Sequence, residues 1–351
     1  MSNQRKMKTL KDFNFKGRRV LVRCDFNVPL SERGEVLDNF RIKETIPTIE
    51  YLIKKDAKVI LMSHLGRPEG KVVEELRLTP IQNRLMEYLD LSVTKSPDCT
   101  GPEIEKWIAE IQPGEILLLE NIQFHPGEKE NDLNFAKTLA SYADIFIMEA
   151  FGQAHRNYAS IVGITKYLPS GAGFLLEKEI KVLTKLRENP EKPLVAIVGG
   201  AKVETKVKLI DKISEVADFV LIGSLIKKEI REKGISLKYP QKTIEPVGDI
   251  NEKDLDPKTI SIFKEKISLA KTVFWAGPLG KIEEEKFQRG SKEIVRVIIE
   301  SGAFSVVGGG EMVGFINKLG LTEKFNHVST GGGALLDFIS SGKLVGIEAL
   351  K

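Results

Sequence analysis

"VAIVGGAKVETKVKLIDKI", residues 195–213, is an apolar, strand-like run that ends at two glycines and continues into a helical pattern. A strand followed directly by a helix is the repeating unit of parallel α/β sheets. Lys202 and Lys206 fall on one face at the start of this helix. Positive charge there opposes the helix dipole, which favours anions. The glycines and the two lysines therefore favour a bound polyanion over the plainer interpretation, two solvated surface lysines.

Similar apolar runs recur along the chain, at residues 18–26, 57–64, 91–96, 115–121 and 144–151, and again at 193–200, 218–224, 271–277 and 304–310. Continuous apolar runs separated by helical patterns are typical of parallel sheets covered by helices on both faces. Between the two series lies an amphipathic helix that prolines terminate. We therefore predict an α/β protein with two domains, residues 1–172 and 193–335, joined by a helix over 173–192.

Composition excludes several classes of protein. The chain has 351 residues, which suggests two domains, and its apolar fraction of 42% is that of a globular protein. The net charge of +4 gives no electrostatic reason to expect a nucleic-acid partner. No apolar run approaches the roughly 20 residues of a membrane helix, and we see no secretory signal at the start. Cys24 and Cys99 form no disulfide framework, so we expect a cytoplasmic protein.

Polar residues follow the predicted strands of the first half, where ligands bind in parallel sheets. They are Asp25, Asn27, His64, Arg67 and Arg156. Arg41 falls in the first turn of a predicted helix, where the dipole disfavours a cation. Because arginine forks suit carboxylate and phosphate groups, three arginines and a histidine in these positions predict a small anionic substrate.

The second half holds three glycine clusters, at residues 199–200, 308–310 and 331–333. A tight turn between a strand and a helix explains any one of them, but three in one domain favour a phosphate-rich ligand. Glu311 follows the second cluster, where phosphate oxygens would arrive. The sequence contains neither GxxxxGK[ST], GxGxxG nor GxSxG, which leaves no P-loop, dinucleotide fingerprint or nucleophile elbow.

These motifs resemble the phosphoglycerate kinase family. The matching segments are collinear over nearly the whole chain: "RCDFNVPL", "DNFRIKETIPTI", "SHLGRP", "LLLENIQFHPGE", "FGQAHR", "AGFLLEKEI", "VGGAKVETK", "WAGPLG", "VVGGGE" and "HVSTGGGALL". The resemblance implies two Rossmann-like domains, with the tail 336–351 returning to the first. It also implies a monomer that moves a phosphoryl group reversibly between 1,3-bisphosphoglycerate and ADP, giving 3-phosphoglycerate and Mg-ATP.

The resemblance also implies site residues. The substrate side would comprise Asp25, Phe26, Asn27, Arg41, His64, Leu65, Gly66, Arg67 and Arg156. The nucleotide side would comprise Lys202, Lys206, Glu283, Gly308, Gly309, Gly310, Glu311 and Met312, with Glu311 at the metal.

The resemblance implies a mechanism as well. Arg41, Lys202 and backbone N–H groups near Gly310 and Gly333 would neutralise the migrating phosphoryl group. The acceptor carboxylate is ionised at neutral pH and needs no general base, so His64 would be a positioning donor. Ligands held by two domains imply a hinge closure.

Several positions depart from the family pattern. Glu311 and Met312 stand where the family has Asp and a small residue, usually one with a hydroxyl, and Ala276 replaces an asparagine beside the nucleotide. Gln123 replaces an arginine that contacts the substrate phosphate, and Glu149 and Gln153 replace an aspartate and a threonine. The segment between residues 224 and 271 lacks a glycine-rich run and is shorter than usual.

Three hypotheses follow from these departures. The chain is a working phosphoglycerate kinase with altered nucleotide selectivity, a related kinase with another small acid or donor, or a non-catalytic relative that binds ligands. The presence of Arg41, Arg156, Lys202 and Lys206 together argues against the third, because a pure binding module would not need the transfer residues. We rank the first hypothesis ahead of the other two.

Overall fold

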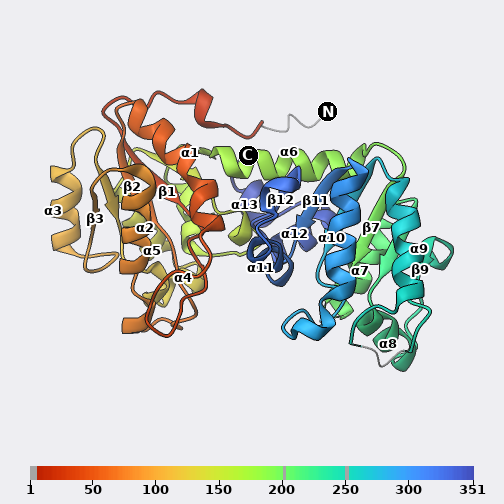
Figure 1. Cartoon of the computed structure of the whole chain (residues 1–351). Helices are drawn as coiled ribbons and strands as arrows, with labels where there is room; N and C mark the ends of the chain where they lie inside the picture. Colours follow the sequence, from red (N-terminus) through yellow and green to blue (C-terminus); the bar gives the residue numbers. More distant parts are fainter. Residues whose placement is uncertain (1–5, 201–202, 250–252) are drawn as a thin grey trace. The chain divides into compact units, whose positions relative to one another are not determined.

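The computed structural model describes residues 6–200, 203–249 and 253–351, which divide into two compact units (Figure 1). Unit 1 comprises the chain up to Ile180 together with Lys343–Lys351, and unit 2 comprises Lys181–Gly342. Within the described residues each unit contains one six-stranded sheet in which every strand pair is parallel. The predicted class, two parallel sheets flanked by helices, is confirmed.

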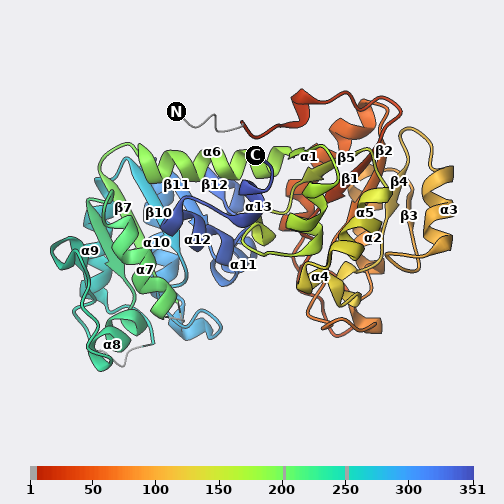
Figure 2. The same cartoon turned by 180° about the vertical axis from the view of Figure 1, so that it is seen from behind.

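The sheet of unit 1 has the order β3-β4-β2-β1-β5-β6. Its strands are β1 (Arg19–Arg23), β2 (Lys58–Met62), β3 (Val93–Lys95), β4 (Ile116–Leu118), β5 (Ile145–Met148) and β6 (Ser170–Ala172). Helices α1 (Phe40–Lys54) and α2 (Thr79–Leu89) lie on one face (Figure 1), and α5 (Leu133–Ser141) lies on the other (Figure 2). The central strands are buried on both sides, which explains why their middle residues are apolar in succession instead of alternating.

Unit 1 also contains α3 (Pro102–Glu110), α4 (Gly127–Glu130) and, from the end of the chain, α13 (Val345–Glu348). The amide of Gly346 donates to the carbonyl of Ala154 at 2.8 Å, which ties α13 to the loop that follows β5. A Cβ at Gly346 would lie 2.7 Å from Ile161 Cγ2, so glycine permits this close contact.

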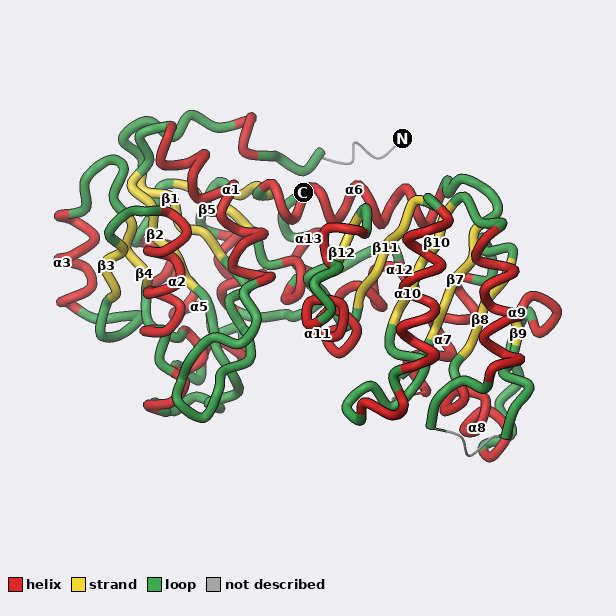
Figure 3. The backbone as a smooth tube through the Cα atoms, viewed as in Figure 1, coloured by secondary structure: helices red, strands yellow, loops and turns green. Residues whose placement is uncertain are grey.

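The sheet of unit 2 has the order β12-β11-β10-β7-β8-β9. Its strands are β7 (Leu194–Val198), β8 (Phe219–Ile222), β9 (Thr243–Ile244), β10 (Thr272–Ala276), β11 (Phe304–Gly308) and β12 (His327–Val328). Helices α9 (Pro257–Ser268) and α10 (Arg289–Ser301) lie side by side on one face, whereas α7 (Val203–Ile213) and α12 (Gly333–Ser341) lie on the other (Figures 1 and 2). The remaining helices are α8 (Ser224–Glu232) and α11 (Gly310–Lys318). The strands lie between helices in both units (Figure 3).

Helix α6 (Phe174–Glu188) contains the boundary between the units, at Ile180 and Lys181. The carboxylate of Glu149 accepts hydrogen bonds from the first-turn amides of Leu175 and Leu176, at 3.1 and 3.3 Å. These bonds satisfy amides that have no partner inside the helix. None of the helices in the described residues is long and apolar enough to cross a membrane.

The sequence missed three strands, β6, β9 and β12, which are two or three residues long and lie at or beside sheet edges. β9 and β12 carry too few residues for an apolar run, and β6 consists of the small residues Ser170–Ala172. Their pairing comes from the neighbouring strand and not from their own pattern.

Candidate active site

Strands β7 and β10 are neighbours in the sheet of unit 2, although β8 and β9 separate them in the sequence. From β7 the sheet extends to one side through β8 and β9. The chain then returns to β10, on the other side of β7, and the sheet extends from there through β11 and β12. Ligands of such sheets bind outside the carboxyl ends of the strands at this switch point. Here the two loops are joined directly, because Gly199 N donates to Ala276 O at 3.0 Å and Gly200 N to Pro278 O at 2.7 Å.

The glycines at this point serve different physical needs. A Cβ at Gly199 would lie 2.0 Å from the carbonyl oxygen of Pro278, and one at Gly308 would lie 2.1 Å from Leu335 Cδ2. Both positions therefore require glycine for packing within the protein. Gly309 has a φ of 100°, which L side chains rarely adopt. A Cβ at Gly310, the first residue of α11, would meet nothing within 4 Å, so its Cα borders open space.

The three glycine clusters of the sequence converge at this edge of the sheet. A Cβ at Gly332 would lie 3.7 Å from Gly310 N, so the turns that start α11 and α12 adjoin. A Cβ at Gly200 would lie 3.9 Å from the carboxylate of Glu311, which brings the first cluster to the second. Two helix N-termini thus begin at one place, an arrangement that favours anions.

Lys206, on α7, points into the same region. Its side chain is 8% exposed, and its Nζ donates to the carbonyl oxygen of Ala276 at 3.3 Å. Burial lowers the pKa of Lys206 to about 8, against the opposing effect of the Glu311 carboxylate. A phosphate group beside this amine would supply the negative charge that favours protonation. Lys202, the other lysine singled out in the sequence, lies outside the described residues.

The other residues expected on the nucleotide side differ in exposure. Glu311 is exposed in the first turn of α11. Glu283 is exposed on the loop after β10. Met312 is fully buried, so its side chain belongs to the core and only its backbone is available to a ligand. The contacts of these residues with a nucleotide stay a prediction, as does the role of Gly333, the first residue of α12.

In unit 1 the polar residues after β1 and β2 form one cluster with Arg41. Arg41 Nη1 lies 3.3 Å from Asp25 Oδ2 and donates to the carbonyl oxygen of Asn27 at 2.8 Å. Asn27 Oδ1 accepts from Gly66 N at 2.9 Å, and His64 Nδ1 lies 4.0 Å from Asp25 Oδ1. Because these residues come from the loops after β1 and β2 and from α1, the hydrogen bonds fix these segments relative to one another.

Burial and nearby charges set the protonation of this cluster. Burial alone would raise the pKa of Asp25, but the guanidinium groups of Arg41 and Arg23 and the amide of Asn27 outweigh it, and the pKa lies below its ordinary value. Burial lowers the pKa of His64 to about 3, so its imidazole is neutral at physiological pH. The cluster therefore presents a guanidinium and a neutral histidine beside an ionised aspartate.

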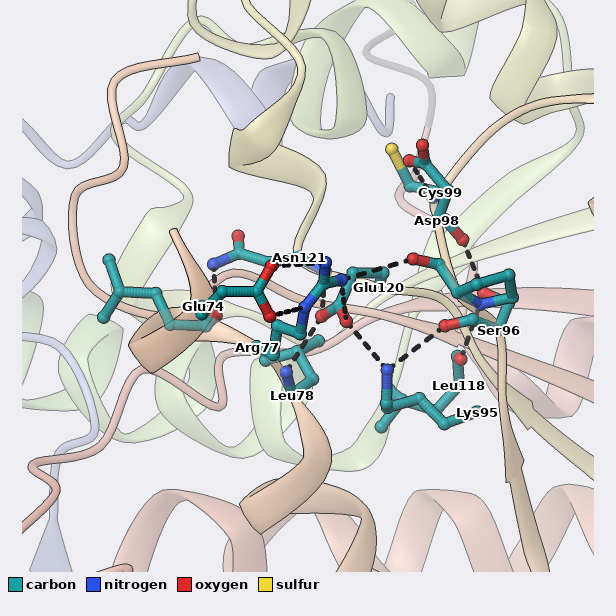
Figure 4. A network of polar contacts seen from close by, with 12 residues as sticks. Glu74, Arg77, Leu78, Lys95, Ser96, Asp98, Cys99, Leu118, Glu120 and Asn121 are labelled. Atoms are coloured by element: carbon teal, nitrogen blue, oxygen red, sulfur yellow. Dashed lines mark hydrogen bonds and ion pairs between the residues drawn. The ribbon is translucent and has the colours of Figure 1, made fainter. Parts of the chain in front are cut away.

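The buried carboxylate of Glu120 is the centre of a polar network that includes Asn121 (Figure 4). Glu120, 1% exposed, accepts from Lys95 at 2.7 Å, from Arg77 at 3.2 Å and from the amide of Asn121 at 2.8 Å. The side-chain amide of Asn121 donates in turn to the carbonyl of Leu65 at 2.8 Å. Phe26, on the neighbouring loop, is buried, and its amide donates to Ser63 Oγ at 2.8 Å.

Three further positions of the predicted substrate site lie on the loops that follow the strands. Arg67 and Arg156 are exposed to solvent, and their contacts with substrate stay a prediction. Gln123 is 4% exposed, and its backbone is bonded on both sides, to Asn121 Oδ1 at 3.1 Å and to Gly70 N at 3.1 Å. The loop is thus ordered without an arginine at position 123.

Sequence reasoning missed Arg23, which ends β1 and is fully buried beside His64. The available signal was a charged residue inside the apolar run 18–26. A charge in a central strand is costly unless it is paired, so it marks either a buried ion pair or a functional site.

Comparisons with known proteins agree with the fold. The sequence model of the family described as phosphoglycerate kinase matches residues 10–236 and 230–343. The phosphoglycerate kinase of Moorella thermoacetica is 42% identical over 387 aligned positions, covering 97% of this chain and 98% of the relative. That of Dictyoglomus turgidum is 41% identical over 389 positions, with coverage of 97% and 98%.

Solved structures give the same result. The phosphoglycerate kinase of Pyrococcus horikoshii superimposes with a TM-score of 0.88 at 30% identity and covers 98% of each chain. That of Coxiella burnetii has a TM-score of 0.81 at 31% identity, with coverage of 98% and 99%.

These comparisons identify a kinase of the two-sheet α/β type. The alignments with the Moorella thermoacetica and Dictyoglomus turgidum proteins cover nearly the whole chain, and about two fifths of the aligned residues are identical. The chain belongs to the phosphoglycerate kinase family, and its activity is that of this glycolytic transferase.

The alignments also show that the chain is short. They span 387 and 389 positions, more than the 351 residues of this sequence, so the relatives carry residues that it lacks. The two stretches matched by the family model meet at residues 230–236, inside the segment 224–271 that the sequence predicts to be shortened.

Proposed function

We propose that this protein transfers a phosphoryl group reversibly between 1,3-bisphosphoglycerate and ADP, with the carboxylate of 3-phosphoglycerate as the acceptor in the ATP-consuming direction. The observation that carries this proposal is the convergence of three glycine-rich turns, Lys206 and Glu311 at the switch point of unit 2. Membership of the family supports an adenine nucleotide as the ligand there. We expect the protein to act as a monomer in the cytoplasm, without nucleic-acid or membrane partners.

The glycerate ligand is assigned to the cluster of unit 1. Arg41 offers a fork suited to a carboxylate or phosphate, and Asp25 fixes it through the 3.3 Å ion pair. Asn27, Gly66 and Leu65 shape the loops, while the exposed Arg67 and Arg156 are free to approach the substrate phosphate. His64 acts as a positioning donor, because a pKa of about 3 leaves it neutral and unable to provide a positive charge.

The nucleotide phosphates are assigned to Lys202, Lys206 and the amides of residues 308–310 and 333. Mg²⁺ fits this site as an ion that arrives with the nucleotide. The described residues contain no group of three or more His, Cys, Asp or Glu able to hold a metal by themselves, whereas Glu311 offers one exposed carboxylate. Mg²⁺ is commonly bound through one or two carboxylates together with substrate phosphates. When bound, it neutralises charge on the phosphate oxygens.

The chemistry requires little of the side chains beyond position and charge. The attacking carboxylate is already ionised at neutral pH, so no residue needs to remove a proton. Arg41, Lys202 and the backbone amides at Gly310 and Gly333 neutralise the phosphoryl group as it moves. Because the two ligands bind to different units, the transfer requires a closure that brings them in line and excludes water.

A coupled assay tests the proposal, with 3-phosphoglycerate, Mg²⁺ and a panel of ATP, GTP and other nucleotides. Lys202→Ala serves as the blank. We expect turnover at least a hundredfold above this blank. The panel also shows whether the shortened segment 224–271 changes the preferred nucleotide. A folded sample that binds 3-phosphoglycerate but shows no turnover with any nucleotide would overturn the assignment and favour a non-catalytic relative.

A further inference from the structure

The central strand of unit 1 ends in a cation that the proposed mechanism does not use. Arg23 is the last residue of β1, and its side chain is fully buried. Its Nε donates to Ser160 Oγ at 2.8 Å, and its Nη1 donates to the carbonyl oxygen of Cys24. The guanidinium is therefore held rigidly at the edge of the sheet where His64 lies.

A second buried residue keeps this guanidinium in place. Glu128, also fully buried, lies 3.8 Å from Arg23 Nη2. Its carboxylate accepts from the hydroxyl of Ser160 at 2.6 Å and from the amide of Ser160 at 2.9 Å. Glu128 comes from α4 and Ser160 from the π-helical turn Ala159–Gly163, so two elements fix the orientation of the fork.

The guanidinium of Arg23 faces the Nδ1 atom of His64. Arg23 Nη2 lies 3.5 Å from His64 Nδ1. A guanidinium has donors and no acceptor, so a ring nitrogen facing it must offer its lone pair. Asp25 Oδ1 lies 4.0 Å from the same nitrogen, which is beyond hydrogen-bonding distance. As an acceptor, this oxygen would favour the opposite tautomer, with the proton on Nδ1. Since the ring is neutral, its single N–H then resides on Nε2.

We propose that Arg23 is a positioning residue that acts through His64: its fork holds Nδ1 as an acceptor, and thereby makes Nε2–H the donor that His64 presents to substrate. The consequence for substrate rests on the role of His64 in the proposed function. The tautomer itself does not, because it is a property of the free protein. An opposite tautomer would present a lone pair to an anionic ligand and repel it.

The tautomer can be measured directly by ¹⁵N NMR of the ring nitrogens in the labelled full-length protein without ligand. His64→Gln identifies the His64 signals among those of the four histidines. We expect Nε2 to show the shift of a protonated nitrogen and Nδ1 that of a bare one. A protonated Nδ1 in the unmodified protein would overturn the proposal, and this measurement needs no variant of Arg23 to fold.

The double variant Arg23→Met/Glu128→Gln tests the role of Arg23. Both residues are changed because loss of one partner alone would leave a buried charge unpaired. The glutamine at position 128 keeps an acceptor for Ser160. We expect the proton to move to Nδ1, where Asp25 is the nearest acceptor, and KM for 3-phosphoglycerate to rise about tenfold to a hundredfold. A smaller effect is expected on kcat, since His64 orients the substrate without neutralising the moving group.

Arg19→Met/Asp144→Asn is the matched control. It removes an ion pair of 3.4 Å at the opposite end of the same strand, away from His64. We expect it to leave both the ring signals and KM unchanged. A folded Arg23→Met/Glu128→Gln protein that keeps Nε2–H and the original KM would overturn the proposal. An absence of turnover in the unmodified protein would instead contradict the proposed function. It would not affect the NMR measurement of the His64 tautomer.

Discussion

The ammonium group of Lys206 lies 3.3 Å from the carbonyl oxygen of Ala276, so α7 reaches from the end of β7 to the end of β10. The side chain is 8% exposed. Burial lowers its pKa to about 8, and the carboxylate of Glu311 limits the shift. Above pH 8 the free protein therefore holds this amine mostly neutral, whereas a neighbouring phosphate favours the charged form.

We predict that nucleotide binding takes up a proton at about pH 9, because the phosphates restore the charge of Lys206. Calorimetric titration in buffers of different ionisation enthalpy measures this uptake. Lys206→Met should abolish it and weaken binding. Lys208→Met, an exposed lysine on the same helix, should leave the uptake unchanged. Equal uptake in the protein with Met at position 206 would show that another group titrates.

Glu311 should serve the metal more than the nucleotide. We predict that Glu311→Gln weakens binding of Mg-ATP about tenfold and binding of metal-free ATP much less, because the amide keeps the size and loses the charge that Mg²⁺ requires. Competition binding with and without Mg²⁺ measures the ratio. Glu323→Gln, an exposed glutamate of the same unit, is the control. Equal loss with both forms of ATP would argue that Glu311 acts only through the charge of Lys206.

The apolar runs predict the long strands well because buried parallel strands need apolar residues on both faces. β1, β2, β7, β10 and β11 all lie inside the predicted runs. The short strands β9 and β12 take their conformation from their neighbours, and no local pattern marks them. Sequence patterns thus predict the middle of each sheet better than its rim.

The reason that the sequence suggests for the glycine clusters is incomplete. The sequence assigns all three to a ligand, but a Cβ at Gly199 or Gly308 would collide with Pro278 O or Leu335 Cδ2 inside the protein. In the cluster 308–310, Gly309 is constrained by its positive φ. Of the other two glycines, only Gly310 borders open space. Contacts between residues far apart in the sequence impose these requirements, so a single sequence does not reveal them.

Gln123 is the clearest weak point of the proposed substrate site, because it lies buried between Asn121 and Gly70 and carries no charge. We predict that Gln123→Arg lowers KM for 3-phosphoglycerate about tenfold or more by adding a charge-assisted contact to its phosphate. Initial-rate kinetics with varied 3-phosphoglycerate measure the change. Gln123→Met has similar length and no charge, and should not lower KM. An unchanged KM in the arginine variant would count against position 123 as a phosphate contact.

Glu149 is fully buried where α6 begins, and Thr48 Oγ1 donates to it at 2.5 Å. Burial raises the pKa of Glu149 to about 7, although the hydrogen bonds from Thr48, Leu175 and Leu176 favour the ionised form. Its ordinary value of 4.5 applies to the unfolded chain. The folded protein therefore binds more protons than the unfolded chain between about pH 4.5 and 7, and the free energy of unfolding falls as pH rises through this window.

We predict that Glu149→Gln stabilises the protein by on the order of 2–3 kcal/mol at pH 8 and has little effect near pH 4, because the amide never ionises and still accepts from the first turn of α6. Urea unfolding at a series of pH values, followed by a probe in unit 1, measures the difference. Glu177→Gln makes the same change at an exposed position of the same helix and should give no pH-dependent difference. A variant that is less stable than the original protein at pH 8 would mean that the ionised carboxylate is the form that α6 needs.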